Sequence, residues 1–124
     1  MEINGEIVNE TIMYDQLGLS EPIMKALAKK GYTQATPVQG GAIPFFMEWK
    51  DVIAKAPTGT GKTFAFGIPM VEHVDPAGED VQALVLAPTR ELAVQIQEEL
   101  RDLCEFKEGV RTVCLYGGAP IGKQ

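Results

Sequence analysis

Long hydrophobic runs, cysteines and histidines are all scarce in this chain. No run approaches the roughly 18 apolar residues that a membrane-spanning helix needs, and the acidic N-terminus does not fit a signal peptide, so we expect no membrane partner. Two cysteines, Cys104 and Cys114, are too few for a disulfide scaffold, and their spacing fits no metal motif. They are typical of buried free thiols in a reducing cytosol, so we expect a cytoplasmic protein. His73 is the only histidine, which argues against a histidine-based metal site or catalytic pair.

Basic residues are scarce too, above all at the N-terminus. The chain carries 11 Lys and Arg against 17 Asp and Glu, which gives a formal net charge of −6. Residues 1–24 contain several acidic side chains and no Lys or Arg. This distribution argues against non-specific binding to nucleic acid, which usually requires a basic patch. With 124 residues and 45% hydrophobic content, the chain suits one globular domain, residues 1–124, with a core of its own.

A phosphate-binding pattern is what the chain does contain, at residues 52–63. A β-prone run stops at Pro57, enters a glycine-containing loop and continues at Lys62 into a helical segment, which is the order of a P-loop. Gly59 and Gly61 can adopt backbone angles that are closed to other residues, so the loop can approach a phosphate closely. Successive backbone N–H groups then point into the loop, beside the positive end of the following helix.

The side chains after the loop complete this pattern. Lys62 is expected to place a cation at the β and γ phosphates of a nucleotide, and Thr63 to offer its hydroxyl to Mg²⁺. Lys62 and Thr63 are therefore the candidate catalytic residues. One departure is that Ala56 stands where the general pattern opens with glycine. The alternative is a surface turn, rich in Gly and Thr, that happens to precede a lysine; the strand-to-helix context disfavours it.

Three strands and four helices are expected along the chain. Ser20 and Thr36 are suited to cap the first two helices, and Gly31 to end the first. The run at 81–87 is almost wholly apolar, as a strand buried on both faces of a parallel sheet requires. Residues 1–13 are expected to form a loose terminal strand or to be disordered. The third and fourth helices are expected at 62–73 and 90–106, and the strands at 51–56, 81–87 and 110–116.

The order of these elements predicts an α/β fold. A helical lead-in at residues 14–39 precedes a β-α-β-α-β core at 51–124, and such helical crossovers join parallel strands flanked by helices. Ligands of parallel sheets bind at the carboxyl ends of the strands. The segments that follow the expected strands are 56–63, 88–90 and 117–118, so we expect a functional rim there.

A metal-holding carboxylate is missing from this rim. P-loop nucleotidases need an acidic residue at the end of a neighbouring strand to hold Mg²⁺, and a further group that orients water. The expected strands end in Ala56, Ala87 and Tyr116, none of which is acidic. The chain is therefore expected to bind a nucleoside phosphate without hydrolysing it, as a fragment of a larger domain would.

Four segments of the chain together resemble the DEAD-box RNA helicase family. Residues 14–39 resemble its Q motif, 56–63 its form of the P-loop, which begins with Ala, 88–95 its motif Ia, and 117–118 a family glycine pair. A P-loop alone is shared by many unrelated ATPases and GTPases, whereas the four segments in this order are specific. The resemblance implies the first part of a RecA-like domain, without the Asp-Glu-Ala-Asp motif, the Ser-Ala-Thr motif or the second RecA-like domain.

The resemblance implies an adenine nucleotide site. Gln39 would read the adenine edge with paired hydrogen bonds, Tyr32 would stack on the base, and Tyr14, where the family usually has Phe, would pack beneath. The implied cofactors are ATP or ADP with Mg²⁺. The other implied nucleotide-binding residues are Thr36, Ala56, Thr58, Gly59, Thr60, Gly61, Lys62 and Thr63.

The resemblance also implies an RNA partner. Backbone N–H groups and a helix N-terminus can hold phosphates without a broad basic patch, which partly reconciles RNA binding with the acidic composition. This chain alone is expected to bind RNA weakly. The implied RNA-binding residues are Pro88, Thr89, Arg90, Gly117 and Gly118.

Each assignment has a plainer alternative, and two positions depart from the family. Gln39 can be an ordinary helix-surface amide, and Tyr32 can serve packing alone. Arg90 can form a salt bridge within its own helix, and the glycine pair can be a turn without function. Trp49 stands where the family commonly has a glycine turn, and the pair at 40–41 is unusual inside a helix.

The interpretation is an ATP-binding fragment of a DEAD-box RNA helicase, whose parent couples ATP binding and hydrolysis to RNA duplex unwinding. The chain alone is expected to lack ATPase and unwinding activity. One alternative is a fragment of another P-loop NTPase, such as a kinase or GTPase, with guanine or no base preference. Another alternative is a nucleotide-binding or interaction module without catalysis. Such a module could form a dimer through the apolar surface that truncation exposes.

Overall fold

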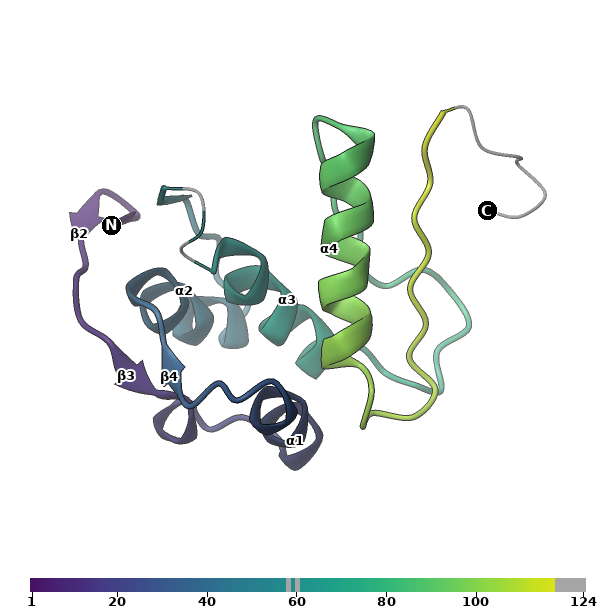
Figure 1. Cartoon of the computed structure of the whole chain (residues 1–124), viewed down its shortest axis with the longest axis horizontal. Coiled ribbons are helices and arrows are strands. Elements are labelled where there is room, and N and C mark those ends of the chain that lie inside the picture. The colour runs from purple at the N-terminus through teal and green to yellow at the C-terminus, as the bar shows by residue number, and fades with distance from the viewer. Residues whose placement is uncertain (58, 60, 118–124) are drawn as a thin grey trace.

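The computed structural model describes residues 1–57, 59 and 61–117, and its regular elements are mainly helical (Figure 1). None of the described helices is long and apolar enough to cross a membrane. The helices are η1 (Tyr14–Leu17, a short 3₁₀ helix), α1 (Glu21–Lys29), α2 (Pro37–Met47), α3 (Lys62–His73) and α4 (Arg90–Leu103).

Local signals set the ends of the first two α-helices, as the sequence predicts. Ser20 precedes α1 in an extended conformation, and Pro22 lies in the first turn, where its missing N–H costs no helical hydrogen bond. Gly31 follows the helix with φ +77°, a left-handed angle that favours glycine. Thr36 and Pro37 stand in the same way at the start of α2.

The two later helices begin where the sequence predicts. α3 covers the expected residues, with Pro69 inside its second half. α4 begins at Arg90 but ends at Leu103 rather than at 106. A turn follows at once, in which the N–H of Lys107 donates to the carbonyl of Cys104 at 3.0 Å. The apolar periodicity therefore extends past the true end of the helix.

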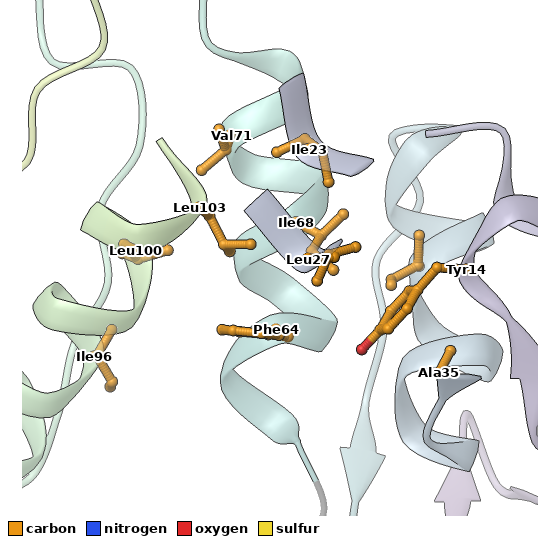
Figure 2. Close-up of a cluster of buried hydrophobic side chains, with 11 residues drawn as sticks. Tyr14, Ile23, Leu27, Ala35, Phe64, Ile68, Val71, Ile96, Leu100 and Leu103 are labelled. Atoms are coloured by element: carbon orange, nitrogen blue, oxygen red, sulfur yellow. The ribbon is translucent and has the colours of Figure 1, made fainter. Parts of the chain in front are cut away.

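Helix α3 occupies the centre of the hydrophobic core. It packs against both α2 and α4, and Figure 2 shows its side chains between those of α1 and α4, with Tyr14 close by. A β-carbon at Gly67 would lie 2.9 Å from Cδ2 of Leu100, so α3 and α4 approach closely at this glycine. The buried cluster consists of Tyr14, Ile23, Leu27, Ala35, Ile43, Phe64, Ile68, Val71, Ile96, Leu100 and Leu103.

The strands are short and antiparallel. β1 (Glu2–Ile3) lies between β2 (Glu6–Ile7) and β5 (Ala54–Lys55) in one sheet. β3 (Ile12–Met13) pairs with β4 (Gln34–Ala35) in a second. The N-terminal residues are thus part of the fold, and the hairpin of β1 and β2 covers one edge of the strand that leads into the P-loop.

Side-chain bonding strengthens this edge pairing. The backbone N–H of Asn4 donates to the carbonyl of Ile53 at 2.7 Å, and the N–H of Ile53 donates to Oδ1 of Asn4 at 2.8 Å. Asn4 has φ +50°, an angle that asparagine tolerates better than most residues. The start of the chain is therefore tied to the segment just before the P-loop.

Two expected strands and their parallel pairing are not formed among the described residues. Segments 81–87 and 110–116 have no strand assignment, and β5 covers only two residues of the expected 51–56. Both segments line one cavity of about 970 Å³ beside α4, and neither has a paired strand beside it among the described residues. Without a ladder partner an extended apolar run stays exposed, and Leu86 is 86% exposed.

The two cysteines are less buried than the sequence predicts. Cys104 follows α4 and Cys114 lies in segment 110–116, and both are free and only partly buried. Burial raises the pKa of the Cys104 thiol, although nearby Lys107 opposes that shift. The thiol of Cys104 is therefore kept protonated.

Glycines let the N-terminal segment pack tightly on α2. A β-carbon at Gly41 would overlap Cδ1 of Ile3, and one at Gly40 would lie 3.2 Å from Cγ1 of Ile12. Glycine weakens a helix interior by about 1 kcal/mol relative to alanine. The pair that looks out of place in the sequence is explained by this close approach of β1 and β3.

Trp49 links the C-terminal ends of α2 and α3 by an aromatic contact. Its ring stacks on that of His73, with centroids 3.8 Å apart and planes inclined by 11°. Trp49 has φ +63°, a left-handed angle that is unfavourable for a bulky residue and that glycine would adopt without strain. A turn is therefore formed at residues 48–49 with tryptophan in the left-handed conformation.

Candidate functional site

The loop before α3 has the backbone that the phosphate-binding pattern requires. Gly59 and Gly61 have φ of +83° and +82°, angles that favour glycine. Gly61 is the N-cap of α3, and no side chain among the described residues caps this helix. The first N–H groups of the helix therefore have no intrahelical acceptor, and the helix dipole adds positive potential there.

The side chains at the start of α3 lie on this loop. Lys62 is exposed, and Thr63 is partly buried in the first turn. Ala56 is partly buried at the entry to the loop and packs on the small core cluster around Ile3. Thr58 and Thr60, which the sequence also assigns to nucleotide binding, lie outside the described residues.

Gln39 reaches the same loop from the first turn of α2. Its Nε2 donates to the carbonyl of Gly61 at 3.2 Å. Its Oε1 accepts from the hydroxyl of Tyr14 and from the backbone N–H of Thr36, the latter at 3.0 Å. The side chain is only 3% exposed, so it is a buried bridge between segment 14–39 and the P-loop, and the surface-amide alternative fails.

A β-carbon at residue 61 would destroy this bridge. It would overlap Nε2 of Gln39 and lie 3.2 Å from Oγ1 of Thr36. Glycine is therefore required at position 61 for two reasons: the left-handed φ angle, and the close approach of the side chains of Gln39 and Thr36. The second of them, Oγ1 of Thr36, is buried and has no hydrogen-bond partner among the residues described.

The two tyrosines assigned to the base lie in different environments. Tyr14 is 2% exposed within the main core. Tyr32 is 48% exposed, and its ring meets Phe64 of the first turn of α3 at an edge-to-face angle of 60°, with centroids 5.9 Å apart. Tyr32 thus stands beside the start of α3 with surface available for a ligand, whereas Tyr14 touches the site only through its hydroxyl.

These observations fit a bound nucleotide. The glycine angles and the uncapped start of α3 suit phosphates, and the orphaned hydroxyl of Thr36 offers a polar atom toward the loop. Gln39 adds an amide whose two polar atoms can read a base edge. Four of the assigned residues, Thr36, Gln39, Gly61 and Lys62, are therefore brought together by the fold.

The residues assigned to RNA form a second group at the start of α4. Pro88, Thr89 and Arg90 are all exposed. The guanidinium of Arg90 lies 5.6 Å from the ring centroid of Tyr116, so segment 110–116 ends beside the start of this helix. Gly117, the next residue, is exposed, while Gly118 lies outside the described part of the chain.

Thr89 has a structural role that can be tested by itself. Its Oγ1 accepts from the backbone N–H of Leu92 at 3.2 Å, so it caps α4. We expect Thr89→Ala to lower the free energy of unfolding by about 1 kcal/mol. Urea denaturation followed by circular dichroism measures this, with Thr89→Ser as a control that keeps the cap. An unchanged midpoint in Thr89→Ala would show that the cap contributes nothing.

The sequence reasoning missed the hydroxyl of Tyr14 and the N-terminal hairpin. It placed Tyr14 beneath the base as packing only, although the added oxygen relative to Phe was a visible signal. The pairing of residues 2–3 with 54–55 had no comparable signal, because strand partners distant in sequence leave no local pattern.

Comparison with known proteins decides the family. A family model described as DEAD/DEAH box helicase matches residues 36–124, more than half of the chain. The chain belongs to the DEAD/DEAH box helicase family. The resemblance drawn from the four sequence segments is thereby confirmed, and the alternative of an unrelated P-loop kinase or GTPase is excluded.

Relatives within the helicase family are similar over nearly the whole chain. ATP-dependent RNA helicase CshA from Limosilactobacillus reuteri is 50% identical over 111 residues, which are 90% of this chain and 22% of that protein. DEAD-box ATP-dependent RNA helicase CshA from Bacillus subtilis is 47% identical over 114 residues, which are 92% of this chain and 23% of that protein. The chain thus spans less than a quarter of the length of these curated relatives.

A solved structure of a DEAD box protein supports the fold. The crystal structure of a DEAD box protein from the hyperthermophile Methanococcus jannaschii matches with a TM-score of 0.82 and 34% identity, over 92% of this chain and 31% of that one. This likeness confirms the expected fold class, an α/β domain of RecA-like type.

Proposed function

We propose that this chain is the ATP-binding part of an RNA helicase that couples ATP binding and hydrolysis to the opening of RNA duplexes. The observation that carries the proposal is the bond from Nε2 of Gln39 to the carbonyl of Gly61. This bond places an amide, which can read a base, beside the loop, which can hold phosphates. One nucleotide can therefore contact both, with its base toward Gln39 and its phosphates toward Lys62.

Base selectivity tests this function. The amide of Gln39 can donate to a ring nitrogen of adenine and accept from its amino group, and such a paired contact discriminates between bases by about 1–3 kcal/mol. We expect fluorescent ADP to bind more tightly than fluorescent GDP, and Gln39→Ala to weaken ADP binding about tenfold with little effect on GDP.

The matched control is Gln95→Ala, which removes an exposed glutamine from α4. It is expected to leave both affinities unchanged within twofold. Equal binding of ADP and GDP by the unaltered chain would contradict the assignment of Gln39 to adenine.

The proposed function includes Mg²⁺ binding at Thr63 but no ATP hydrolysis by this chain alone. Thr63 would offer its hydroxyl to Mg²⁺ carried by the nucleotide, where the ion neutralises phosphate charge. The 124 residues by themselves are expected not to turn ATP over, because no acidic residue follows segments 51–56, 81–87 or 110–116. A phosphate-release assay checks this, and turnover that Lys62→Ala abolishes would refute it.

RNA contacts are proposed at the start of α4. Thr89 and Arg90 are exposed there, and the end of segment 110–116 approaches through Tyr116. The N-terminus of α4 and the backbone N–H groups of Thr89, Arg90 and residues 117–118 would hold phosphates and sugars, while Pro88, which has no backbone N–H, would contribute only by contact. Because the chain carries a net charge of −6, its affinity for single-stranded RNA is expected to be weak and to fall further with salt.

Self-association is a second candidate role, favoured by one exposed apolar surface. Segments 81–87 and 110–116 expose the side chains of Leu84 and Leu86 (78% and 86%) and of Leu115 (66%). We propose that a second copy of the chain covers this surface, because unpaired strands and exposed leucines are sites of association. Sedimentation velocity is expected to show dimers whose fraction rises with concentration.

The control for self-association is a charge on the proposed surface. Leu86→Glu is expected to give a monomer, while Ile7→Glu, which alters an exposed isoleucine of β2, leaves the dimer in place. A clean monomer of the unaltered chain at high concentration would rule out this role.

A further inference from the structure

The orientation of the Gln39 amide is unambiguous. Its oxygen accepts from the backbone N–H of Thr36, a group that can only donate, and its nitrogen donates to the carbonyl of Gly61, a group that can only accept. The oxygen therefore faces the hydroxyl of Tyr14 as an acceptor. Tyr14 must donate its proton in that bond.

Tyr14 is held by a backbone hydrogen bond and by the core around its ring. Its backbone N–H donates to the carbonyl of Thr33 at 3.0 Å, and its ring lies in the main core with Leu27 and Ala35 (Figure 2). Burial raises the pKa of Tyr14 to about 12, although the bond to Gln39 opposes that shift. The hydroxyl is therefore protonated and able to donate at neutral pH.

The oxygen of Gln39 is fully used in this arrangement. An amide oxygen has two lone pairs, and here Thr36 and Tyr14 each occupy one. The amide nitrogen has one N–H left, which can donate to a ring nitrogen of adenine. The amino group of adenine can reach the oxygen only if one present donor leaves. The N–H of Thr36 is part of the backbone at the start of α2, whereas the Tyr14 hydroxyl can rotate.

We propose that Tyr14 is a specificity-determining residue of the nucleotide site, whose hydroxyl competes with the amino group of adenine for Oε1 of Gln39. The inference rests on the proposed role of Gln39 in reading adenine. Without nucleotide, the hydroxyl occupies the oxygen and helps to keep Gln39 on the P-loop. When adenine binds, the hydroxyl loses its acceptor inside the core, which opposes binding. Tyrosine at this position thus weakens and tunes adenine affinity relative to phenylalanine.

The substitution Tyr14→Phe tests this competition, because it removes only the hydroxyl. We expect the Kd of fluorescent ADP to fall about 5- to 10-fold and that of GDP to stay within twofold, so that the preference for adenine rises. In the background of Gln39→Ala, the same substitution is expected to give no gain, because the contested oxygen is gone. Circular dichroism confirms that each variant is folded.

A second measurement needs no nucleotide. In ¹⁵N spectra of the free chain, Tyr14→Phe is expected to shift the side-chain amide signals of Gln39 while those of the exposed Gln95 stay in place. Weaker ADP binding, an equal gain for ADP and GDP, or unmoved Gln39 signals would overturn the role of Tyr14 while leaving the nucleotide site intact. Loss of all preference between ADP and GDP in the unaltered chain would instead overturn the proposed function, and this inference with it.

Discussion

Replacing Ile68 by alanine is expected to lower the free energy of unfolding by about 2–5 kcal/mol, a large part of the stability of a small domain. Ile68 lies in α3 with no exposed surface, inside the cluster that joins α1, α3 and α4 (Figure 2). The substitution removes buried methyl groups and leaves a cavity that surrounding helices fill only in part. Urea unfolding followed by circular dichroism measures the loss.

Two controls separate burial from the change of residue type. Ile68→Val removes one methylene group and is expected to cost about 0.5–1.5 kcal/mol. Ile7→Ala makes the same substitution as the test at a side chain that is 80% exposed, and it is expected to change stability by less than about 0.5 kcal/mol. If Ile68→Ala and Ile7→Ala had equal effects, the central position of α3 in the core would be wrong.

Replacing Lys62 by alanine is expected to weaken nucleotide binding by about 10- to 150-fold, the range for losing a hydrogen bond to a charged group. Lys62 is exposed at the first position of α3, directly after Gly61 with its left-handed φ. Its ammonium would stand at the phosphates while the core remains as it is. Titration with fluorescent ADP and Mg²⁺ measures the loss, and urea unfolding is expected to show unchanged stability.

The control for this experiment is a lysine elsewhere on the surface. Lys25 lies on α1 and forms an exposed ion pair with Glu21 at 3.2 Å. Lys25→Ala alters net charge by the same amount, and its ADP affinity is expected to stay within twofold of the original. ADP affinity equal in Lys62→Ala and Lys25→Ala would show that general electrostatics, and not a contact at the P-loop, holds the nucleotide.

The helices were predictable because their signals are local. Ser20, Thr36 and Pro37 act on the first turn of the helix that they precede, so the sequence alone places α1 and α2. The P-loop was predictable for the same reason, since its glycines and Lys62 are neighbours in sequence. The end of α4 was less predictable, because the apolar periodicity of the sequence continues past Leu103 into a turn.

The strands and the contacts of the site were less predictable. An apolar run such as 81–87 suggests a strand, but a strand forms only when a second segment pairs with it, and no such pairing is formed among the described residues. Conversely, residues 2–3 gave little sign that they would pair with 54–55. The likeness of Gln39 to the family motif predicted its closeness to the P-loop, but not which atoms would bind its amide.

The sequence by itself determined the family, through four segments in a specific order. It also determined the helix starts and the left-handed glycines of the phosphate loop, because these depend on residues adjacent in the chain. Only the tertiary structure decided that Gln39 is buried between Tyr14, Thr36 and Gly61, since these residues meet through the packing of η1, α2 and α3. It also decided that the Tyr14 hydroxyl donates to Oε1 of Gln39, the atom for which we propose that adenine competes. Hydrogen-bond saturation depends on three-dimensional neighbours, and no local pattern encodes it.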